Sequence, residues 1–181
     1  VIDGEAVVAS TRYRSDGRGL TLRRYRSDGS LRWRRDQGFA MSASVDVSAI
    51  SAVQNGFAVI VVGDVDGTGP RVALLRFDAN GQLLATTRSP DTVHVVSDAV
   101  LATRSDRMVA LYRESTASGA ERCGAFATSE LGDLVWAWAE NQAIGEVLHC
   151  RQIAIAPDGA TWIIGSLQGR PRAVRLNADG T

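Results

Sequence analysis

The sequence predicts an all-β fold, a β-propeller of four-stranded antiparallel blades that repeat about every 50 residues. The prediction rests on two turn positions that recur along the 181 residues, and on a gradient of burial within each repeat. The first turn position is occupied by Gly29, Gly81, Gly132 and Gly180, in steps of 52, 51 and 48 residues. The second lies at positions 4, 56, 106 and 159, in steps of 52, 50 and 53 residues. Two landmarks that share one period indicate a repeated unit of supersecondary structure.

The first turn position joins two short strands in each repeat. It reads Asp28-Gly29, Asn80-Gly81 and Asp179-Gly180, each after an apolar run. Asp-Gly and Asn-Gly are strong hairpin signals, because a type I′ turn needs positive φ at both central residues. Leu131-Gly132 departs from this pattern and makes the third copy the weakest.

Four strands are expected in each repeat, and their burial differs. In the clearest copies the first to fourth strands cover residues 95–103, 57–62, 71–77 and 82–87. The second strands, at 57–62 and 161–164, are continuously apolar, which indicates burial on both faces. The fourth strands alternate, with Leu31 and Trp33 between arginines, which indicates half-exposed strands. Buried strands beside a wetter outer strand are typical of a propeller blade.

One stretch also fits a helix. Leu131, Leu134, Val135 and Trp138 follow the i, i+3, i+4, i+7 pattern, so a helix over 131–148 competes with a fourth strand there. We favour the strand, because the repeat register requires one at this place.

The strand order is expected to be second-third-fourth, then two complete units, then first-second-third. This order gives 14 strands in an incomplete ring of about 3.5 blades, one partial propeller over residues 1–181. Its approximate units are 1–46, 47–94, 95–146 and 147–181. Because a closed ring of roughly six to eight blades needs more strands, we expect a fragment whose partners include the remaining blades of a parent chain. The alternative is a ring of eight incomplete blades formed by two copies.

Two segments, "LRRYRSDGSLRW" and "FATSELGDLVW", resemble the PQQ-like repeat of bacterial β-propeller proteins, in which an Asp-Gly or Thr-Gly turn precedes a strand that carries Trp. Residues 77–81 keep the turn, but Thr86 and Thr87 stand at the end of the strand that follows. Nothing matches the quinone- or calcium-ligating residues of the enzymes in that group. The resemblance therefore implies a fold and not a dehydrogenase.

Composition argues against several partners. The formal net charge is zero, with 20 basic and 20 acidic residues, so we expect no nucleic acid partner. No run of 18 apolar residues is present, so we expect no membrane insertion. The arginine-rich stretch from Leu22 to Arg35, with Tyr25 and Trp33, can in principle bind phosphates or stack bases. We favour a charged outer hairpin that discourages edge pairing.

Few residues suggest chemistry. Asp64 and Asp66 in "GDVDGTG" have a spacing seen in short calcium loops, but a later acidic ligand is missing and Asp and Gly also suit a tight loop. His94 and His149 both fall between a fourth strand and the next first strand, where we favour plain loop residues over a metal or acid–base pair. We expect no metal, no cofactor and no catalytic residue, because the sequence lacks a nucleophile elbow, a P-loop and paired carboxylates.

The two cysteines fall at related places in the repeat. Cys123 opens an expected third strand, and Cys150 opens the first strand of the next unit. In an up-and-down blade both openings lie at the same face, so a Cys123–Cys150 disulfide and two separate buried thiols are the two expectations. A bridge implies an oxidising compartment, periplasmic or extracellular.

The favoured function is a non-catalytic binding or scaffolding module, in which loops at one rim of a rigid propeller bind a protein or a small ligand. One alternative is a part of a propeller enzyme, of PQQ-like or hydrolase type, whose active site uses blades outside this chain. A ligand-sensing ectodomain is the other.

Overall fold

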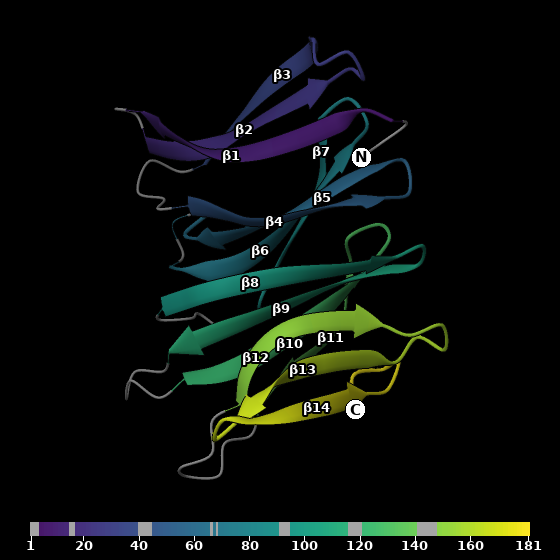
Figure 1. Ribbon diagram of the computed structural model, residues 1–181. Coiled ribbons are helices and arrows are strands. Elements are labelled where there is room, and N and C mark those ends of the chain that lie inside the picture. Colours follow the sequence, from purple (N-terminus) through teal and green to yellow (C-terminus); the bar gives the residue numbers. More distant parts are fainter. Residues whose placement is uncertain are drawn as a thin grey trace.

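The computed structural model consists of antiparallel β-sheets that stack one on the next (Figure 1). It describes residues 4–14, 17–39, 45–65, 67, 69–90, 95–115, 121–140 and 148–181. We call the four sheets blades 1 to 4, with strand orders β1-β2-β3, β4-β5-β6-β7, β8-β9-β10-β11 and β12-β13-β14. None of these described residues forms a helix, so none offers an apolar helix long enough to cross a membrane.

The described residues hold fourteen strands in the predicted order, which confirms the incomplete propeller. Blade 1 contains β1 (Ala6–Arg14), β2 (Gly17–Tyr25) and β3 (Leu31–Gly38). Blade 2 contains β4 (Val45–Val53), β5 (Gly56–Gly63), β6 (Arg71–Asp78) and β7 (Leu83–Arg88). Blade 3 contains β8 (Val95–Arg104), β9 (Arg107–Ser115), β10 (Glu121–Ser129) and β11 (Leu134–Ala139). Blade 4 contains β12 (Leu148–Ile155), β13 (Thr161–Leu167) and β14 (Arg170–Leu176).

The stretch that also fitted a helix forms a turn and then β11, so the strand interpretation holds for the described part of 131–148. The apolar side chains at helical spacing share no buried face: Trp138 packs partly buried against the blade 3–blade 4 core, whereas Leu131, Leu134 and Val135 are exposed. Residues 141–147 lie outside the described residues.

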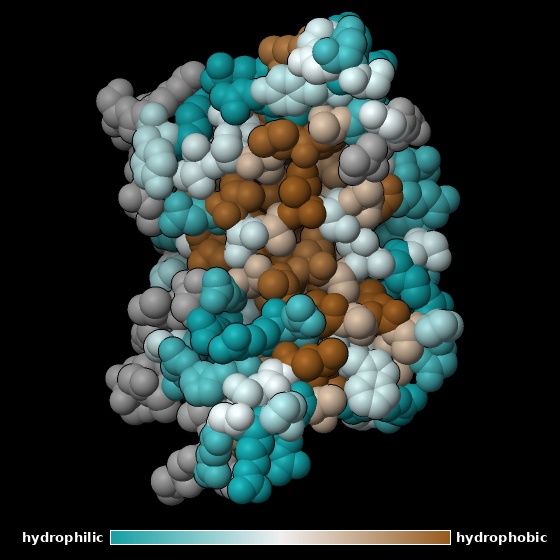
Figure 2. Space-filling view, in the orientation of Figure 1, coloured by the Kyte–Doolittle hydropathy of each residue, from teal (hydrophilic) through white to brown (hydrophobic). Residues whose placement is uncertain are grey.

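The first strands β4, β8 and β12 lie side by side and form the inner wall, with β1 next to β4 (Figure 1). Side chains link these strands: Ser48 Oγ donates to the Ala99 carbonyl at 2.8 Å, and Ser51 Oγ lies 2.9 Å from Thr103 Oγ1. Apolar side chains gather along the middle of this wall and hydrophilic ones toward its margins (Figure 2). We call the margin where β4, β8 and β12 begin the entry rim, and the opposite margin the turn rim.

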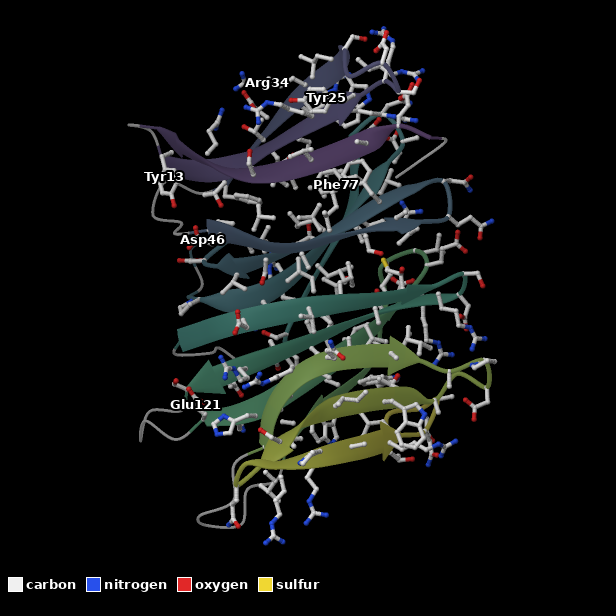
Figure 3. All side chains as sticks on the ribbon, in the orientation of Figure 1. Tyr13, Tyr25, Arg34, Asp46, Phe77 and Glu121 are labelled. Carbon is white, nitrogen blue, oxygen red and sulfur yellow. A yellow bond between two sulfur atoms is a disulfide. The ribbon has the colours of Figure 1, made fainter. Side chains whose placement is uncertain are left out.

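Apolar faces of neighbouring blades form the core. Between blades 1 and 2, Leu20 and Leu22 pack against Phe57 and Phe77, which points into this space (Figure 3). The rings of Phe57 and Phe77 stack at 5.1 Å between centroids, and Trp33 stacks on Phe57 at 6.3 Å. Similar cores lie between blades 2 and 3 and between blades 3 and 4. Each blade is therefore stabilised mainly by apolar area that only its neighbours can bury.

At the turn rim, an arginine of one blade binds the hairpin of the next. Arg24 Nη1 donates to the Ala79 carbonyl at 2.7 Å, and Arg76 Nε donates to the Glu130 carbonyl at 3.3 Å. Both arginines stand five residues before their own turn glycine, and both acceptors stand two residues before theirs. Blade 3 has Ala127 at the donor position, and there Arg107 Nη1 from β9 donates to the equivalent acceptor, the Ala178 carbonyl, at 2.9 Å.

A tryptophan from the fourth strand of the preceding blade packs against two of the turn glycines. A methyl group on Gly81 would come within 2.8 Å of Trp33 Cη2, and one on Gly180 within 2.8 Å of Trp136 Cγ. Both glycines have positive φ, so the turn and the tryptophan together require glycine there. The strand that follows each hairpin thus fixes the position of the next blade.

Aspartates close the hairpins. The Asp28, Asp158 and Asp179 carboxylates accept from the backbone N–H two residues on, at 2.8, 3.0 and 3.1 Å. The Ala160 N–H and then Arg175 lower the pKa of Asp158, because both favour its charged form. The turns are thus stabilised by ionised carboxylates.

Replacing Arg76 by Met should lower the free energy of unfolding by about 3 kcal/mol, because three backbone carbonyls lose a charged donor in a buried place. Arg76 is 5% exposed and also donates to the Phe77 and Gln54 carbonyls at 2.6 Å each. Urea unfolding measures the change. Arg170→Met, on the exposed start of β14, is the control and should change stability by less than about 0.5 kcal/mol. A loss at Arg76 no larger than that of the control would contradict the role of this arginine.

Replacing Asp158 by Asn should lower the melting temperature at neutral pH but not in strong acid. The folded-state pKa of Asp158 lies below its ordinary value, so its charge stabilises the fold above that ordinary value. This contribution is lost as the pH falls through the folded-state pKa. Thermal unfolding of both proteins from about pH 7 to about pH 2 should show the two melting temperatures converging. A constant difference down to the acid limit is the result that this mechanism excludes.

Candidate ligand pocket at the entry rim

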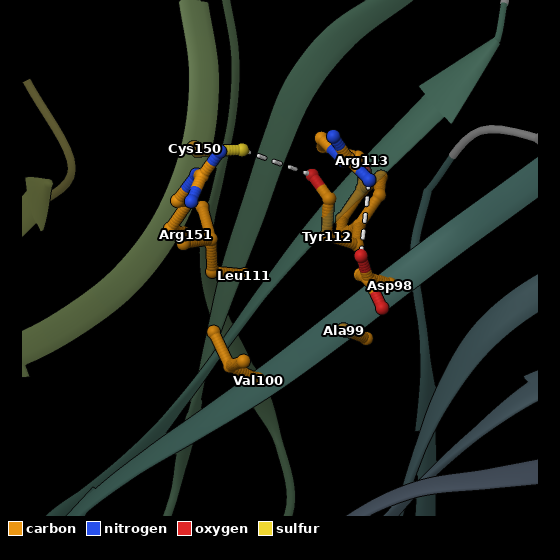
Figure 4. A pocket seen from close by; sticks show the side chains of 8 residues that line it. All are labelled: Asp98, Ala99, Val100, Leu111, Tyr112, Arg113, Cys150 and Arg151. Atoms are coloured by element: carbon orange, nitrogen blue, oxygen red, sulfur yellow. Dashed lines mark hydrogen bonds and ion pairs between the residues drawn. The ribbon is translucent and has the colours of Figure 1, made fainter. Parts of the chain in front are cut away.

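A pocket of about 380 Å³ opens between blades 3 and 4 near the entry rim (Figure 4). Blade 3 contributes the start of β8 and the end of β9, and blade 4 contributes the start of β12. Its lining residues are Asp98, Ala99, Val100, Leu111, Tyr112, Arg113, Cys150 and Arg151. Apolar residues from the blade core are thus placed beside three charged side chains.

Charge in this pocket is mainly positive. Arg113 Nη2 lies 3.0 Å from Asp98 Oδ2, and the Asp98 side chain is 74% exposed. Arg151 stands at a bulge of β12, where the pairing with β13 shifts between Cys150 and Gln152. No described residue forms an ion pair with Arg151, and the buried Nε of Arg113 has no hydrogen-bond acceptor among the described residues. The pocket lining therefore holds two guanidinium groups and one exposed carboxylate, which pairs with Arg113 alone.

A disulfide holds the two blades together beside the pocket. Cys123 at the start of β10 is bonded to Cys150, which lines the pocket from β12. Cys150 Sγ also lies 3.8 Å from the Tyr112 carbonyl oxygen, a contact without a proton because the sulfur is in a disulfide. The Glu140 carboxylate accepts from the Leu148 N–H at 3.2 Å and from the Cys123 N–H at 3.4 Å. The blade 3–blade 4 wall is thus fixed covalently and by a carboxylate.

Further charged pairs lie at the entry rim of blade 3. Glu114, almost fully buried, forms an ion pair with Arg122 across β9 and β10. Glu121, at the start of β10 (Figure 3), lies with Oε2 3.4 Å from Nδ1 of His149 on β12. Within the described residues, His149 therefore has a carboxylate neighbour from the adjacent blade. No group of three or more His, Cys, Asp or Glu side chains in the described part of the chain is arranged to hold a metal ion.

The candidate residues from the sequence have different fates. Cys123 and Cys150 are brought together. Asp64 Oδ1 accepts from the Gly67 N–H at 2.6 Å, as a loop-closing aspartate does. Asp66 and His94 lie outside the described residues, so the expectation that they are plain loop residues, and not parts of a calcium loop or a His94–His149 pair, stays a prediction.

Arginines of the 22–35 stretch are in contact with carboxylates and turns. Arg24 Nε and Arg32 Nη1 lie 2.6 and 2.7 Å from the two oxygens of Glu5. Arg34 Nη2 lies 3.2 Å from Asp36 Oδ2. Arg32 and Arg34 lie on the outer strand β3, whereas Leu22 and Arg24 on the middle strand β2 are buried, so only part of the stretch is an outer strand.

Asp98, Arg113 and Arg151 were not identified from the sequence as a group. They are separated by 15 and 38 positions, and the expected functional residues were those of loops rather than of strand ends. The available signal was the run Tyr112-Arg113-Glu114 at the end of a buried strand, where the apolar pattern stops and charges begin.

No family model and no curated protein matches the sequence. Among solved structures, the fold is similar to an alpha-L-arabinanase of Penicillium chrysogenum complexed with arabinobiose (TM-score 0.52, 9% identity, 100% of this chain and 66% of that one). It is also similar to an ACO/RPE65 chimera (TM-score 0.50, 10% identity, 97% of this chain and 44% of that one). Both neighbours are propeller-like. Because the sequence identity is only 9% and 10%, the likeness shows the fold alone. The chain spans less than two thirds of the length of either.

Replacing both Cys123 and Cys150 by Ala should lower the free energy of unfolding by about 3 kcal/mol, because the bridge closes a loop between residues 27 positions apart. Urea unfolding in oxidising and reducing buffer measures this loss. Reductant should weaken the wild-type chain and leave the double variant unchanged. If reductant has no effect on either protein, the bridge does not form in solution.

Proposed function

We propose that the chain is a binding module whose entry-rim pocket takes a ligand with a carboxylate or a similar planar anion. The observation that carries the proposal is the pair of guanidinium groups, Arg113 and Arg151, on one pocket that has a single, exposed carboxylate. Guanidinium groups bind carboxylates with two parallel hydrogen bonds. A ligand of this kind could be a small acid or an acidic side chain of a partner protein.

Asp98 is suited to giving way to such a ligand. An ion pair this exposed stabilises the protein by about 1 kcal/mol or less, so its exchange for a ligand carboxylate costs little. Until then Asp98 keeps Arg113 oriented. The apolar floor of Ala99, Val100 and Leu111 offers a surface for the non-polar part of the ligand.

The lining residues support binding more than catalysis. They hold one carboxylate and no nucleophile with an adjacent base, which acid–base or covalent chemistry needs. His149 beside Glu121 at the same rim supports the second candidate, a part of a propeller enzyme, since a histidine with a carboxylate neighbour can exchange protons. One of the similar folds is itself an arabinanase.

Two finer proposals concern the type of repeat and the compartment. The packing of Trp33 and Trp136 on the next turn glycine supports the bacterial PQQ-like repeat type. The Cys123–Cys150 bridge supports a periplasmic or extracellular protein. We propose that its partner is a protein or a small ligand at the entry rim, and not a nucleic acid.

Titration of the isotope-labelled chain with succinate and with glucuronate, followed by NMR, tests the binding proposal. Both acids should shift backbone resonances of residues 98–100, 111–113 and 150–151, and neutral arabinobiose should not. Arg151→Gln should weaken binding about tenfold, which corresponds to about 1.4 kcal/mol. The matched control, Arg170→Gln, changes another exposed entry-rim arginine and should bind as the wild type does.

Three results would overturn this function. If neither succinate nor glucuronate shifts these resonances, the pocket does not bind anions. If the Arg151→Gln and wild-type chains bind equally well, Arg151 is not part of an anion site. If the wild-type chain releases arabinose from arabinobiose and the His149→Ala variant does not, the enzyme candidate is correct instead.

A further inference from the structure

In blades 2 and 3, the second and third strands turn an equivalent set of residues toward the blade that follows. In blade 2 these residues are Ala58, Ile60, Val72, Leu74 and Arg76, and in blade 3 they are Val109, Leu111, Cys123, Ala125 and Ala127. The strand pairing defines the equivalence, because Ala58 opposes Arg76, Val109 opposes Ala127 and, in blade 4, Trp162 opposes Arg175. The blade 4 set is therefore Trp162, Ile164, Pro171, Ala173 and Arg175, which we call the blade 4 face.

The blade 4 face is exposed where its equivalents are buried. The apolar members in blades 2 and 3 are at most 1% exposed. In contrast, Trp162 is 39% and Ile164 is 45% exposed, and Pro171, Ala173 and Arg175 are also exposed. None of these five side chains is buried by another described residue. An apolar centre at a position that is core in the preceding repeats is typical of a surface that another element buries.

Arg175 adds a specific donor to this face. It stands five residues before Gly180, the place that Arg24 and Arg76 occupy in their repeats. Those two arginines reach a carbonyl of the next hairpin, whereas Arg175 donates within its own blade, to Asp158 Oδ2 at 3.1 Å and Asn177 Oδ1 at 2.8 Å. Both present acceptors are exposed. Arg175 can therefore turn to a new carbonyl without leaving a buried group unpaired.

We propose that the blade 4 face is the docking surface for a further blade of the same repeat in the same polypeptide. That blade presents an apolar sheet face to Trp162, Ile164 and Ala173. Its hairpin places the carbonyl two residues before the turn glycine on the Arg175 guanidinium. The inference stands on the surface chemistry of blade 4 and is independent of the anion pocket.

A second copy of this chain fits the face less well. Its blade 1 would supply the facing side chains, and there Ser10, Thr21 and Arg23 stand where blade 2 has Val61, Ala73 and Leu75. Arg23 has Ser10 Oγ as its side-chain partner at 3.4 Å. Pressing this arginine against Ile164 and Ala173 would bury a charge without a carboxylate, which is costly.

The test lengthens the chain in register. Thr181 follows Gly180 as Asp133 follows Gly132, so a second copy of residues 134–181, with its cysteine replaced by Ala, is joined directly to Thr181. The added residues supply a fourth strand to blade 4 and then three strands of a further blade. Ala173→Cys in the original blade 4 gives one free thiol, because the native cysteines are bridged.

The rate of thiol labelling at Ala173→Cys should fall at least tenfold in the lengthened chain, independently of protein concentration. In the lengthened chain, adding Arg175→Ala to Ala173→Cys should raise the labelling rate about threefold above that of the single variant. Adding Arg170→Ala should leave the rate unchanged. Leu131→Cys, 79% exposed on another blade, is the control and should label equally fast in both chains. Equal labelling of Ala173→Cys in both chains overturns the proposal. If labelling of Ala173→Cys in the original chain becomes slower as the protein concentration rises, a second copy covers the blade 4 face. That result also overturns the proposal.

A second measurement needs no added blade. In the original chain, Trp162→Thr should leave the urea midpoint unchanged and reduce binding of the dye ANS, because Trp162 lies on an uncovered face. Ile163→Thr, the neighbour that points into the blade 3–blade 4 core and is fully buried, should lower the midpoint strongly. If both variants lose the same stability, the blade 4 face is not the open surface described here.

Discussion

The structure depends on the fact that a single blade cannot bury its own apolar faces. A three- or four-stranded sheet has two such faces and no second layer of its own, so each blade needs a neighbour on either side. Leu20 and Leu22 need Phe57 and Phe77, and Val109 and Leu111 need Ile163. The apolar second strands and the more polar outer strands follow from this requirement.

Repetition made the fold predictable from sequence. Strand number, order and approximate position follow from the spacing of turn glycines and from apolar runs such as 57–62, because local turn chemistry and burial both recur. The contacts between blades were less accessible. Arg24 and Arg76 look like ordinary surface arginines in the sequence, and only the stacked sheets show that each reaches a backbone carbonyl of the next hairpin.

The pocket was predictable only in part. The repeat register placed Cys123 and Cys150 at one face, because both open strands that run in the same direction. The grouping of Asp98, Arg113 and Arg151 needs three further facts: the pairing of β8 with β9, the packing of β12 on both, and the bulge at Arg151. A bulge changes which way a side chain points, and sequence periodicity does not reveal it. The two rims also differ, since arginines that donate to hairpin carbonyls link the blades at the turn rim, while a disulfide links blades 3 and 4 at the entry rim.

The acceptor carbonyl at Ala178 is served by Arg107 of a second strand rather than by the third-strand arginine that serves Ala79 and Glu130. Equivalent acceptors are therefore reached by two routes, from the third strand or from the second strand of the preceding blade. The position that carries Arg24 and Arg76 is Ala127 in blade 3, yet the equivalent oxygen is still bound. The bond from blade to blade is thus kept although the residue that donates it changes, so the stacking of the sheets does not depend on a single repeated arginine.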